Sequence, residues 1–169
     1  MKLETERLII TEFNTDMAQA VHENSLDEDN RRFVPDEVFE TREEALETIE
    51  FLMFCYDGTE GPFVYPVLTK DSNINLGYVQ FVPLDDGTWE IGYHIAKQYT
   101  GNGYATEAVK AFLPVMADRF AVTEVYGICL LENVASVHVL KKCGFEKEFE
   151  GTGEYQGETR EIYKSVWKR

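Results

Sequence analysis

A glycine-containing loop between an extended segment and a helical one constrains the fold of this chain most. The extended segment ends near Ile95, the loop contains Gly101 and Gly103, and apolar residues recur at helical spacing from Ala105 onward. Free backbone N–H groups and the dipole at the start of such a helix attract anions. The segment therefore predicts a strand, a phosphate-binding loop and a helix, although Gly-x-Gly is also common in purely structural turns.

The apolar periodicity changes twice along the chain. The expected strands lie at 8–13, 63–69, 76–83, 88–96, 122–131, 145–150 and 159–167. The expected helices lie at about 15–24, from the capping box at 41–44 to Tyr56, from Ala105 to Met116 with a kink at Pro114, and at 133–142 before the capping residue Gly144. Residues 25–40 are expected to form a loop with at most one helical turn. The middle strands predict an antiparallel meander, and the length predicts one domain over residues 1–169.

The chain is strongly acidic. Its 169 residues include 31 Asp and Glu against 16 Lys and Arg, a net charge of −15. This sign is opposite to that of a surface that binds phosphate backbones, so no nucleic-acid partner is expected. The stretch 23–60 alone contains thirteen acidic residues and three arginines. Such a stretch either keeps the protein in solution or attracts a cationic partner.

The three cysteines, Cys55, Cys129 and Cys143, have no paired spacing and lie in apolar surroundings. They are expected to be reduced core residues, which indicates a cytoplasmic protein, and no metal site is predicted. No segment approaches the ~18 consecutive apolar residues of a membrane span, and the N-terminal residues are too acidic for a signal peptide. No membrane partner is therefore expected.

A dinucleotide is one candidate ligand for the glycine loop. The strand, loop and helix, followed by the strand at 122–131, form a βαβ unit with Glu132 available to a ribose. However, Thr106 replaces the third glycine of the fingerprint, and the strand ends several residues before Gly101. Antiparallel strands also precede the unit, where a Rossmann domain would begin with it.

Two sequence blocks resemble those of another family. Residues 101–108, Gly-Asn-Gly-Tyr-Ala-Thr-Glu-Ala, resemble the pyrophosphate-binding motif of the GNAT acetyltransferases, and residues 133–145 resemble their second motif. The opening residues 4–8 and the strand from Glu90 are similar to the branch that acetylates ribosomal protein N-termini and spermidine. The resemblance covers nearly the whole chain. It implies an α/β (α+β) GNAT fold, with a mixed, mostly antiparallel central sheet flanked by helices.

The resemblance also implies that acetyl-CoA is bound, with its pyrophosphate on the N–H groups of residues 101–105 and with Asn133 and Ser136 facing the pantetheine. The cofactor-binding residues expected from it are Ile95, Thr100, Gly101, Asn102, Gly103, Tyr104, Ala105, Thr106, Asn133 and Ser136. Many family members carry Gln or Arg at the position of Thr100, but backbone donors do most of the work in such a loop. Asn133 is equally expected as an ordinary helix N-cap, and the two roles are compatible.

Acetyl transfer from a thioester to an amine requires a base for the amine and hydrogen-bond donors for the developing negative charge. Glu90 and His94 lie on one face of the strand at 88–96, opposite to Tyr93, and either serve the chemistry or form a solvated sheet face. Given the resemblance, Glu90 is the expected base. Ser136 is the expected donor, since the position where many family members have a tyrosine acid is Leu140.

The sequence therefore predicts an acetyl-CoA-dependent N-acetyltransferase that acts on a primary amine. The acidic stretch indicates a cationic acceptor: a basic peptide N-terminus, a polyamine or an aminoglycoside. The alternatives are a non-catalytic CoA-binding sensor, which Leu140 leaves open, and a dinucleotide-binding oxidoreductase. The protein is expected to be a monomer or a homodimer.

Overall fold

The computed structural model describes all residues from Met1 to Arg169 and is built around one eight-stranded sheet. The strands are β1 (Leu3–Glu4), β2 (Leu8–Ile10), β3 (Phe63–Thr69), β4 (Asn75–Pro83), β5 (Trp89–Ile95), β6 (Glu124–Leu130), β7 (Glu146–Tyr155) and β8 (Glu158–Lys168). The α-helices are α1 (Ala18–Ser25), α2 (Glu28–Phe33), α3 (Arg42–Cys55), α4 (Tyr104–Arg119) and α5 (Val134–Lys142), and short 3-10 turns lie at Thr15–Met17, Pro35–Glu37 and Lys97–Tyr99. None of the helices combines the length and the apolar composition that crossing a membrane requires.

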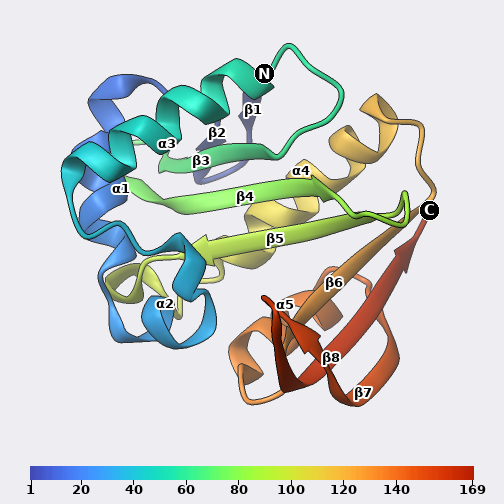
Figure 1. Cartoon of the computed structure of the whole chain (residues 1–169). Coiled ribbons are helices and arrows are strands. Elements are labelled where there is room, and N and C mark those ends of the chain that lie inside the picture. The colour runs from blue at the N-terminus through green and yellow to red at the C-terminus, as the bar shows by residue number, and fades with distance from the viewer.

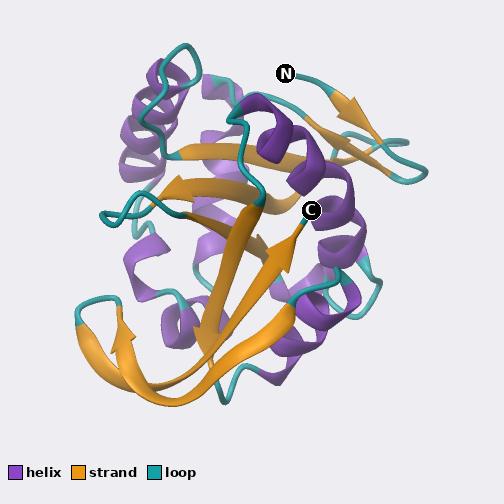
Figure 2. Ribbon diagram, turned by 90° about the vertical axis from the view of Figure 1, so that its right-hand side faces the viewer, coloured by secondary structure: helices purple, strands orange, loops and turns teal.

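The sheet divides between β5 and β6. Its strand order is β1-β2-β3-β4-β5-β6-β8-β7, and every neighbouring pair is antiparallel except β5 with β6. In that parallel pair, Glu90 and Tyr126 are the only residues paired across the two strands. Figure 2 shows the consequence, because the strands of the second half run in a different direction from those of the first. Glu90 therefore lies at the point where the two halves of the sheet still touch.

Helices cover both faces of the first half of the sheet. Tyr65 of β3 packs against Phe112 of α4, with ring centroids 5.5 Å apart, and α4 passes behind β4 and β5 in Figure 1. The next residue toward the N-terminus, Val64, points to the opposite face, where it shares a cavity wall with Ile49 of α3. Burial of these apolar side chains is the main favourable contribution to the fold.

Most of the expected elements are confirmed, including the meander of β3, β4 and β5 and the helix α5. Gly144 ends α5 with a φ of 87°, and its N–H donates to the Lys141 carbonyl at 3.1 Å. The helix that contains Pro114 continues to Arg119, beyond its expected end. At the C-terminus, β7 and β8 are longer than expected and are joined by a tight turn at Gln156 and Gly157.

The expectation of a loop over residues 25–40 was wrong in part. This stretch contains α2, which begins after Asp27, and the Asp27 carboxylate accepts a hydrogen bond from the Asn30 N–H at 2.7 Å. A helix of six residues is too short to reveal a helical period in the sequence, so only its N-cap could have indicated it. The strand expected at 8–13 ends at Ile10, and β1 was not predicted.

Candidate active site

A cleft of about 390 Å³ lies between the glycine loop, β5 and the N-terminal half of α5, and is called the glycine-loop cleft below. Gly101 and Gly103 have φ values of 81° and 78°, a region that L side chains rarely adopt, and α4 begins directly after them. No backbone N–H from residue 101 to residue 106 has an acceptor within the protein. The cleft therefore ends on a row of free donors at the positive end of a sixteen-residue helix.

The cleft collects most of the residues that the sequence singles out for cofactor binding. Those that line it are Ile95, Thr100, Gly101, Gly103, Tyr104, Ala105, Thr106, Asn133 and Ser136. Asn102 does not line the cleft. Its side chain instead donates to the carbonyls of Tyr99, at 3.0 Å, and Thr100, at 3.3 Å. The Asn102 side chain thus holds the shape of the loop, while its backbone N–H belongs to the row of free donors.

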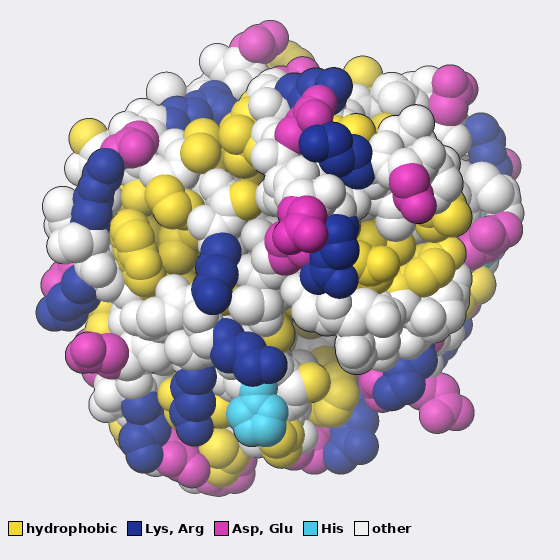
Figure 3. Space-filling view, turned by 180° about the vertical axis from the view of Figure 1, so that it is seen from behind, with side chains coloured by type: hydrophobic (Ala, Val, Ile, Leu, Met, Phe, Trp, Pro, Cys, Tyr) yellow, Lys and Arg dark blue, Asp and Glu magenta, His cyan; other side chains and the backbone are white.

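The glycine-loop cleft is basic although the chain as a whole is acidic. Lys97, His138 and Lys142 line it, and the one carboxylate in its wall, Asp29, pairs with Lys97. Figure 3, which views the molecule from behind, shows Lys and Arg side chains gathered around a histidine on the lower part of that face. An anionic ligand therefore meets positive side chains as well as the free N–H groups of the loop.

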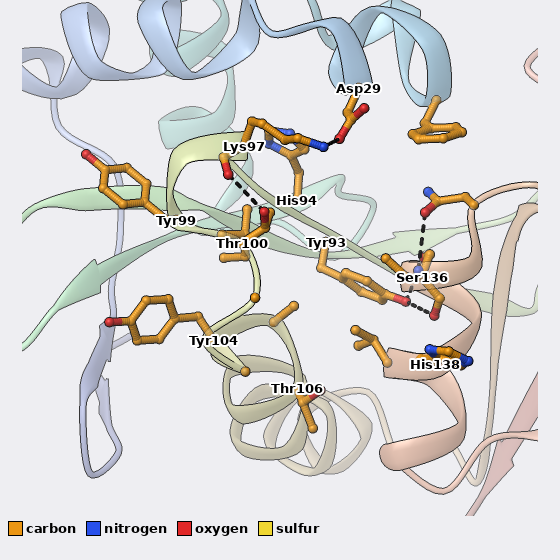
Figure 4. Close-up of a pocket in the computed structure, with 18 of the residues that line it drawn as sticks. Asp29, Tyr93, His94, Lys97, Tyr99, Thr100, Tyr104, Thr106, Ser136 and His138 are labelled. Carbon is orange, nitrogen blue, oxygen red and sulfur yellow. Dashed lines mark hydrogen bonds and ion pairs between the residues drawn. The ribbon is translucent and has the colours of Figure 1, made fainter.

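Tyr93 and Ser136 join β5 to α5 inside the cleft. Their hydroxyl oxygens lie 2.8 Å apart, and the Tyr93 hydroxyl also lies 2.9 Å from the Ser136 carbonyl oxygen (Figure 4). Burial raises the pKa of Tyr93, so its hydroxyl remains protonated at neutral pH. The Asn133 side chain accepts from the Ser136 N–H at 3.2 Å, the N-cap role expected for it. The pair therefore places two hydroxyl groups where the cleft meets the next cavity.

Tyr93 was not singled out in the sequence because strand alternation places it on the face opposite to Glu90. Both residues nevertheless line one cavity, since the sheet opens beside β5 and gives access to both of its faces. Leu140, the position at which a tyrosine acid was considered, is buried and packs over Gly127 of β6. A tyrosine hydroxyl from β5 thus lies in the region where α5 supplies Ser136 but no tyrosine.

Glu90 lies in a second cavity of about 400 Å³ that shares Val34, Tyr93, Asn133 and Ser136 with the glycine-loop cleft. The charged residues that line this acidic cavity are Glu37, Glu90 and Glu154, and no Lys, Arg or His lines it. Burial raises the pKa of Glu90 to about 7, and the negative charge of Glu37 raises it further. The Ile128 N–H and the Lys164 charge act in the opposite direction and lower it. A carboxylate with this pKa can accept a proton near neutral pH.

His94 shares its face of β5 with Glu90, and it too is largely shielded from solvent. Its side chain is only 14% exposed, and its Nε2 lies 3.8 Å from the Asp27 carboxylate. Burial lowers the pKa of His94, although Asp27 and Asp29 oppose the shift. His94 lines the glycine-loop cleft but not the acidic cavity, so Glu90 is better placed as a base.

Cys143 and Cys129 are buried, in agreement with the expectation of core cysteines. Burial raises the pKa of each thiol to about 11. Neither forms a thiolate readily at neutral pH, so neither is a suitable nucleophile.

Glu37 is a residue of this region that the sequence did not distinguish from its acidic neighbours. Burial raises its pKa to about 7, and its Oε1 accepts from the Gln80 side chain at 3.4 Å. Other acids of the same stretch, Glu43, Glu44, Glu47 and Glu50, lie on the exposed face of α3. The stretch 23–60 therefore contains both solvated acids and acids that face the cavities.

Known proteins resemble this chain in both sequence and structure. The model of the Acetyltransferase (GNAT) domain matches residues 7–146. The uncharacterized N-acetyltransferase YnaD of Bacillus subtilis (strain 168) is 30% identical over 149 residues, which cover 88% of this chain and 84% of that protein. The crystal structure of a GNAT acetyltransferase from Bacillus anthracis has a TM-score of 0.83 and 27% identity, covering 99% of this chain and 98% of that one. RimL, a ribosomal L7/L12 α-N-protein acetyltransferase solved with coenzyme A, has a TM-score of 0.79 and 18% identity, covering 99% of this chain and 98% of that one.

This chain belongs to the GNAT family of acetyltransferases. The fold expected from the two sequence blocks is confirmed, as is the expectation of an N-acetyltransferase. A Rossmann arrangement does not describe this sheet, in which β5 and β6 are the only parallel neighbours. The dinucleotide-binding alternative therefore has no support in the topology.

Proposed function

We propose that this chain, as a single domain over residues 1–169, binds acetyl-CoA in the glycine-loop cleft and transfers the acetyl group to a primary amine in the acidic cavity. The observation that carries the proposal is the junction of the two cavities. The free N–H groups of the loop lie in one, the Glu90 carboxylate lies in the other, and the Tyr93–Ser136 pair lines both.

The residues of the glycine-loop cleft fit acetyl-CoA. The N–H groups of residues 101–106 are suited to the pyrophosphate, and the side chains of Lys97 and Lys142 are suited to its negative charge. Asn133 and Ser136 line the part of the cleft nearest the acidic cavity, where the pantetheine arm is expected. The coenzyme A bound to RimL, a protein of the same fold, supports this choice of ligand.

When bound, acetyl-CoA would supply a thioester whose carbonyl carbon forms the new C–N bond with the amine. The C–S bond then breaks, and CoA leaves as a thiolate that takes up a proton and is released as the thiol. Glu90 takes the proton that the amine must lose, directly or through a water. Its pKa of about 7 lets the carboxylate accept a proton and release it again near neutral pH. The Tyr93 hydroxyl donates a hydrogen bond to Ser136, and the Ser136 hydroxyl is placed to donate a hydrogen bond to negative charge that develops at the junction. Tyr93 keeps its own proton, since its pKa is raised.

The charge of the acidic cavity supports a cationic acceptor. Glu37, Glu90 and Glu154 attract an ammonium and repel a carboxylate, and no positive side chain lines the same cavity. A peptide N-terminus, a polyamine and an aminoglycoside all carry such a group. A non-catalytic sensor would not need a carboxylate of raised pKa beside the cofactor junction.

An amine panel tests this proposal. The purified protein is incubated with acetyl-CoA and peptides, polyamines, aminoglycosides or simple alkylamines, while thiol release and acetylated product are measured. The proposal requires amine-dependent thiol release with a matching gain of one acetyl group on the amine. Tight binding of acetyl-CoA without transfer to any amine would support the sensor instead.

A further inference from the structure

A third cavity, of about 220 Å³, lies beneath α1 and α3 and adjoins the acidic cavity. We call it the apolar chamber. Its apolar wall consists of Phe13, Val21, Phe39, Ile49, Leu52, Val64 and Tyr78. Tyr78, Gln80 and Glu37 line both the chamber and the acidic cavity, so they form the boundary between the two.

Unpartnered polar atoms are concentrated in this chamber. Four buried side-chain polar atoms of the whole chain lack a hydrogen-bond partner, and three of them, Asn30 Oδ1, Glu37 Oε2 and Asn75 Nδ2, belong to residues of the chamber wall. A buried polar atom without a partner typically costs about 1–3 kcal/mol of stability. The residues that carry three of these atoms therefore border one cavity and need partners that the rest of the chain does not supply.

The orientations of the two asparagine amides are set by their other contacts. The Asn30 Nδ2 donates to the carbonyls of Ser25, at 2.9 Å, and Glu37, at 3.0 Å, which leaves Oδ1 free. The Asn75 Oδ1 accepts from the Gly77 N–H at 3.0 Å, which leaves Nδ2 free. The wall of the chamber thus contains an acceptor, a donor and a carboxylate oxygen that lack partners within the protein.

A glycine allows the boundary to form. Gly92 of β5 pairs with Gln80 of β4, and a Cβ at Gly92 would overlap the Gln80 side chain. Without that Cβ, Gln80 lies across the sheet and reaches the Glu37 Oε1. This contact orients Glu37, whose other oxygen, Oε2, has no partner.

From these observations we infer that the acceptor is an amine with an apolar body, whose ammonium binds Glu37 next to Glu90 and whose body occupies the apolar chamber. The inference rests on the proposed function, because it assigns the acceptor of that reaction. A polyamine fits less well, since the acids of the chamber wall are the adjacent Asp36 and Glu37 and the rest of the wall has no acid to meet a distant second ammonium.

Direct binding tests this inference without requiring turnover. Ethylamine, pentylamine, spermidine and a peptide that begins with leucine are titrated calorimetrically into the protein saturated with CoA. Pentylamine should bind more tightly than ethylamine by up to about fourfold for each additional buried methylene. The titration with the peptide shows whether the site prefers a peptide N-terminus or a small alkylamine, since both carry an ammonium next to an apolar group. Equal affinity for ethylamine and pentylamine, or a preference for spermidine, would overturn the inference.

Three variants assign the effect to the chamber. Glu37→Gln should weaken pentylamine binding at least about tenfold, because it removes the charge that meets the ammonium. Thr48→Leu, in the chamber wall, should reduce the advantage of pentylamine over ethylamine. Glu47→Gln is the matched control, since it makes the same charge change on the exposed face of α3 and should leave binding unchanged. If Glu37→Gln and Glu47→Gln behave alike, the assignment of Glu37 is wrong.

Failure of the inference and failure of the proposed function give different results. Acetyl transfer to amines without chain-length preference or dependence on Glu37 contradicts the chamber but leaves the enzyme activity. Tight, Glu37-dependent binding of pentylamine without any acetyl transfer contradicts the proposed function but leaves the chamber as an amine site.

Discussion

Arg7 of the segment before β2 and Glu107 of α4 form an ion pair that ties the N-terminal part of the chain to the glycine loop. The Arg7 Nε and Nη2 each lie 2.7 Å from the Glu107 Oε2, and the Arg7 Nη1 donates to the Asn102 carbonyl at 2.9 Å. The guanidinium also lies over the Tyr104 ring, 4.7 Å from its centre. Arg7 therefore contacts the glycine loop and the first turn of α4 together.

Replacing Arg7 should weaken acetyl-CoA binding without removing any group that lines the glycine-loop cleft. Arg7→Ala is expected to raise the Kd for acetyl-CoA by about three- to tenfold, since the loop loses the donor that holds its Asn102 carbonyl. Calorimetry measures this effect. Lys2→Ala, which removes another exposed cation near the N-terminus, serves as the control. An unchanged Kd in Arg7→Ala would show that the loop keeps its shape without this contact.

A negative charge introduced at the free donors should have a larger effect. Ala105→Asp places a carboxylate in the cleft wall, beside the N–H groups proposed to bind the pyrophosphate, and should raise the Kd for acetyl-CoA more than about tenfold. Val115→Asp adds the same charge at an exposed position of the same helix and should have little effect. Similar affinities in the two folded variants would contradict the proposed location of the pyrophosphate.

The Tyr93 hydroxyl should matter for turnover more than for cofactor affinity. Tyr93→Phe keeps the ring and removes the group that contacts the Ser136 hydroxyl and carbonyl. We expect kcat to fall about tenfold with little change in the Kd for acetyl-CoA. Steady-state kinetics together with calorimetry separate the two quantities. If both change equally, Tyr93 serves to shape the cleft rather than to stabilise charge during transfer.

The parts of this site that depend on local sequence could be predicted, and the parts that depend on tertiary contacts could not. The glycine loop, the Asn133 cap and Gly144 each act within a few residues of their own position, so their residue types are informative. Tyr93 and Ser136 lie 43 positions apart and meet only because β5 and β6 separate. Glu37 becomes distinct from the other acids of its stretch only through burial against Gln80.

The buried carboxyl of Glu37 should make the stability of the protein depend on pH. Its pKa is about 7 in the folded protein against an ordinary value of 4.5, so the folded state holds a proton that the unfolded state releases between these values. Stability should therefore fall as the pH rises from about 4.5 to about 7. Thermal unfolding at about pH 5 and about pH 8 measures the decrease in Tm, which should be smaller in Glu37→Gln than in the wild type. Part of the decrease should persist in Glu37→Gln, because Glu90 also has a pKa of about 7. The full decrease should remain in Glu47→Gln, and a full wild-type decrease in Glu37→Gln would contradict the burial of this charge.

The most direct test of the account is the pH dependence of kcat, at saturating amine, for the wild type and Glu90→Gln. With Glu90 as the base, the wild-type kcat should rise with pH through an apparent pKa near 7, because only the deprotonated carboxylate accepts the proton of the amine. Glu90→Gln should lower kcat about a hundredfold and remove this inflection, while the Kd for acetyl-CoA stays the same. Glu154→Gln, which changes another acid of the same cavity, should keep the wild-type profile. A Glu90→Gln variant with the wild-type rate and the same inflection would show that Glu90 is not the base.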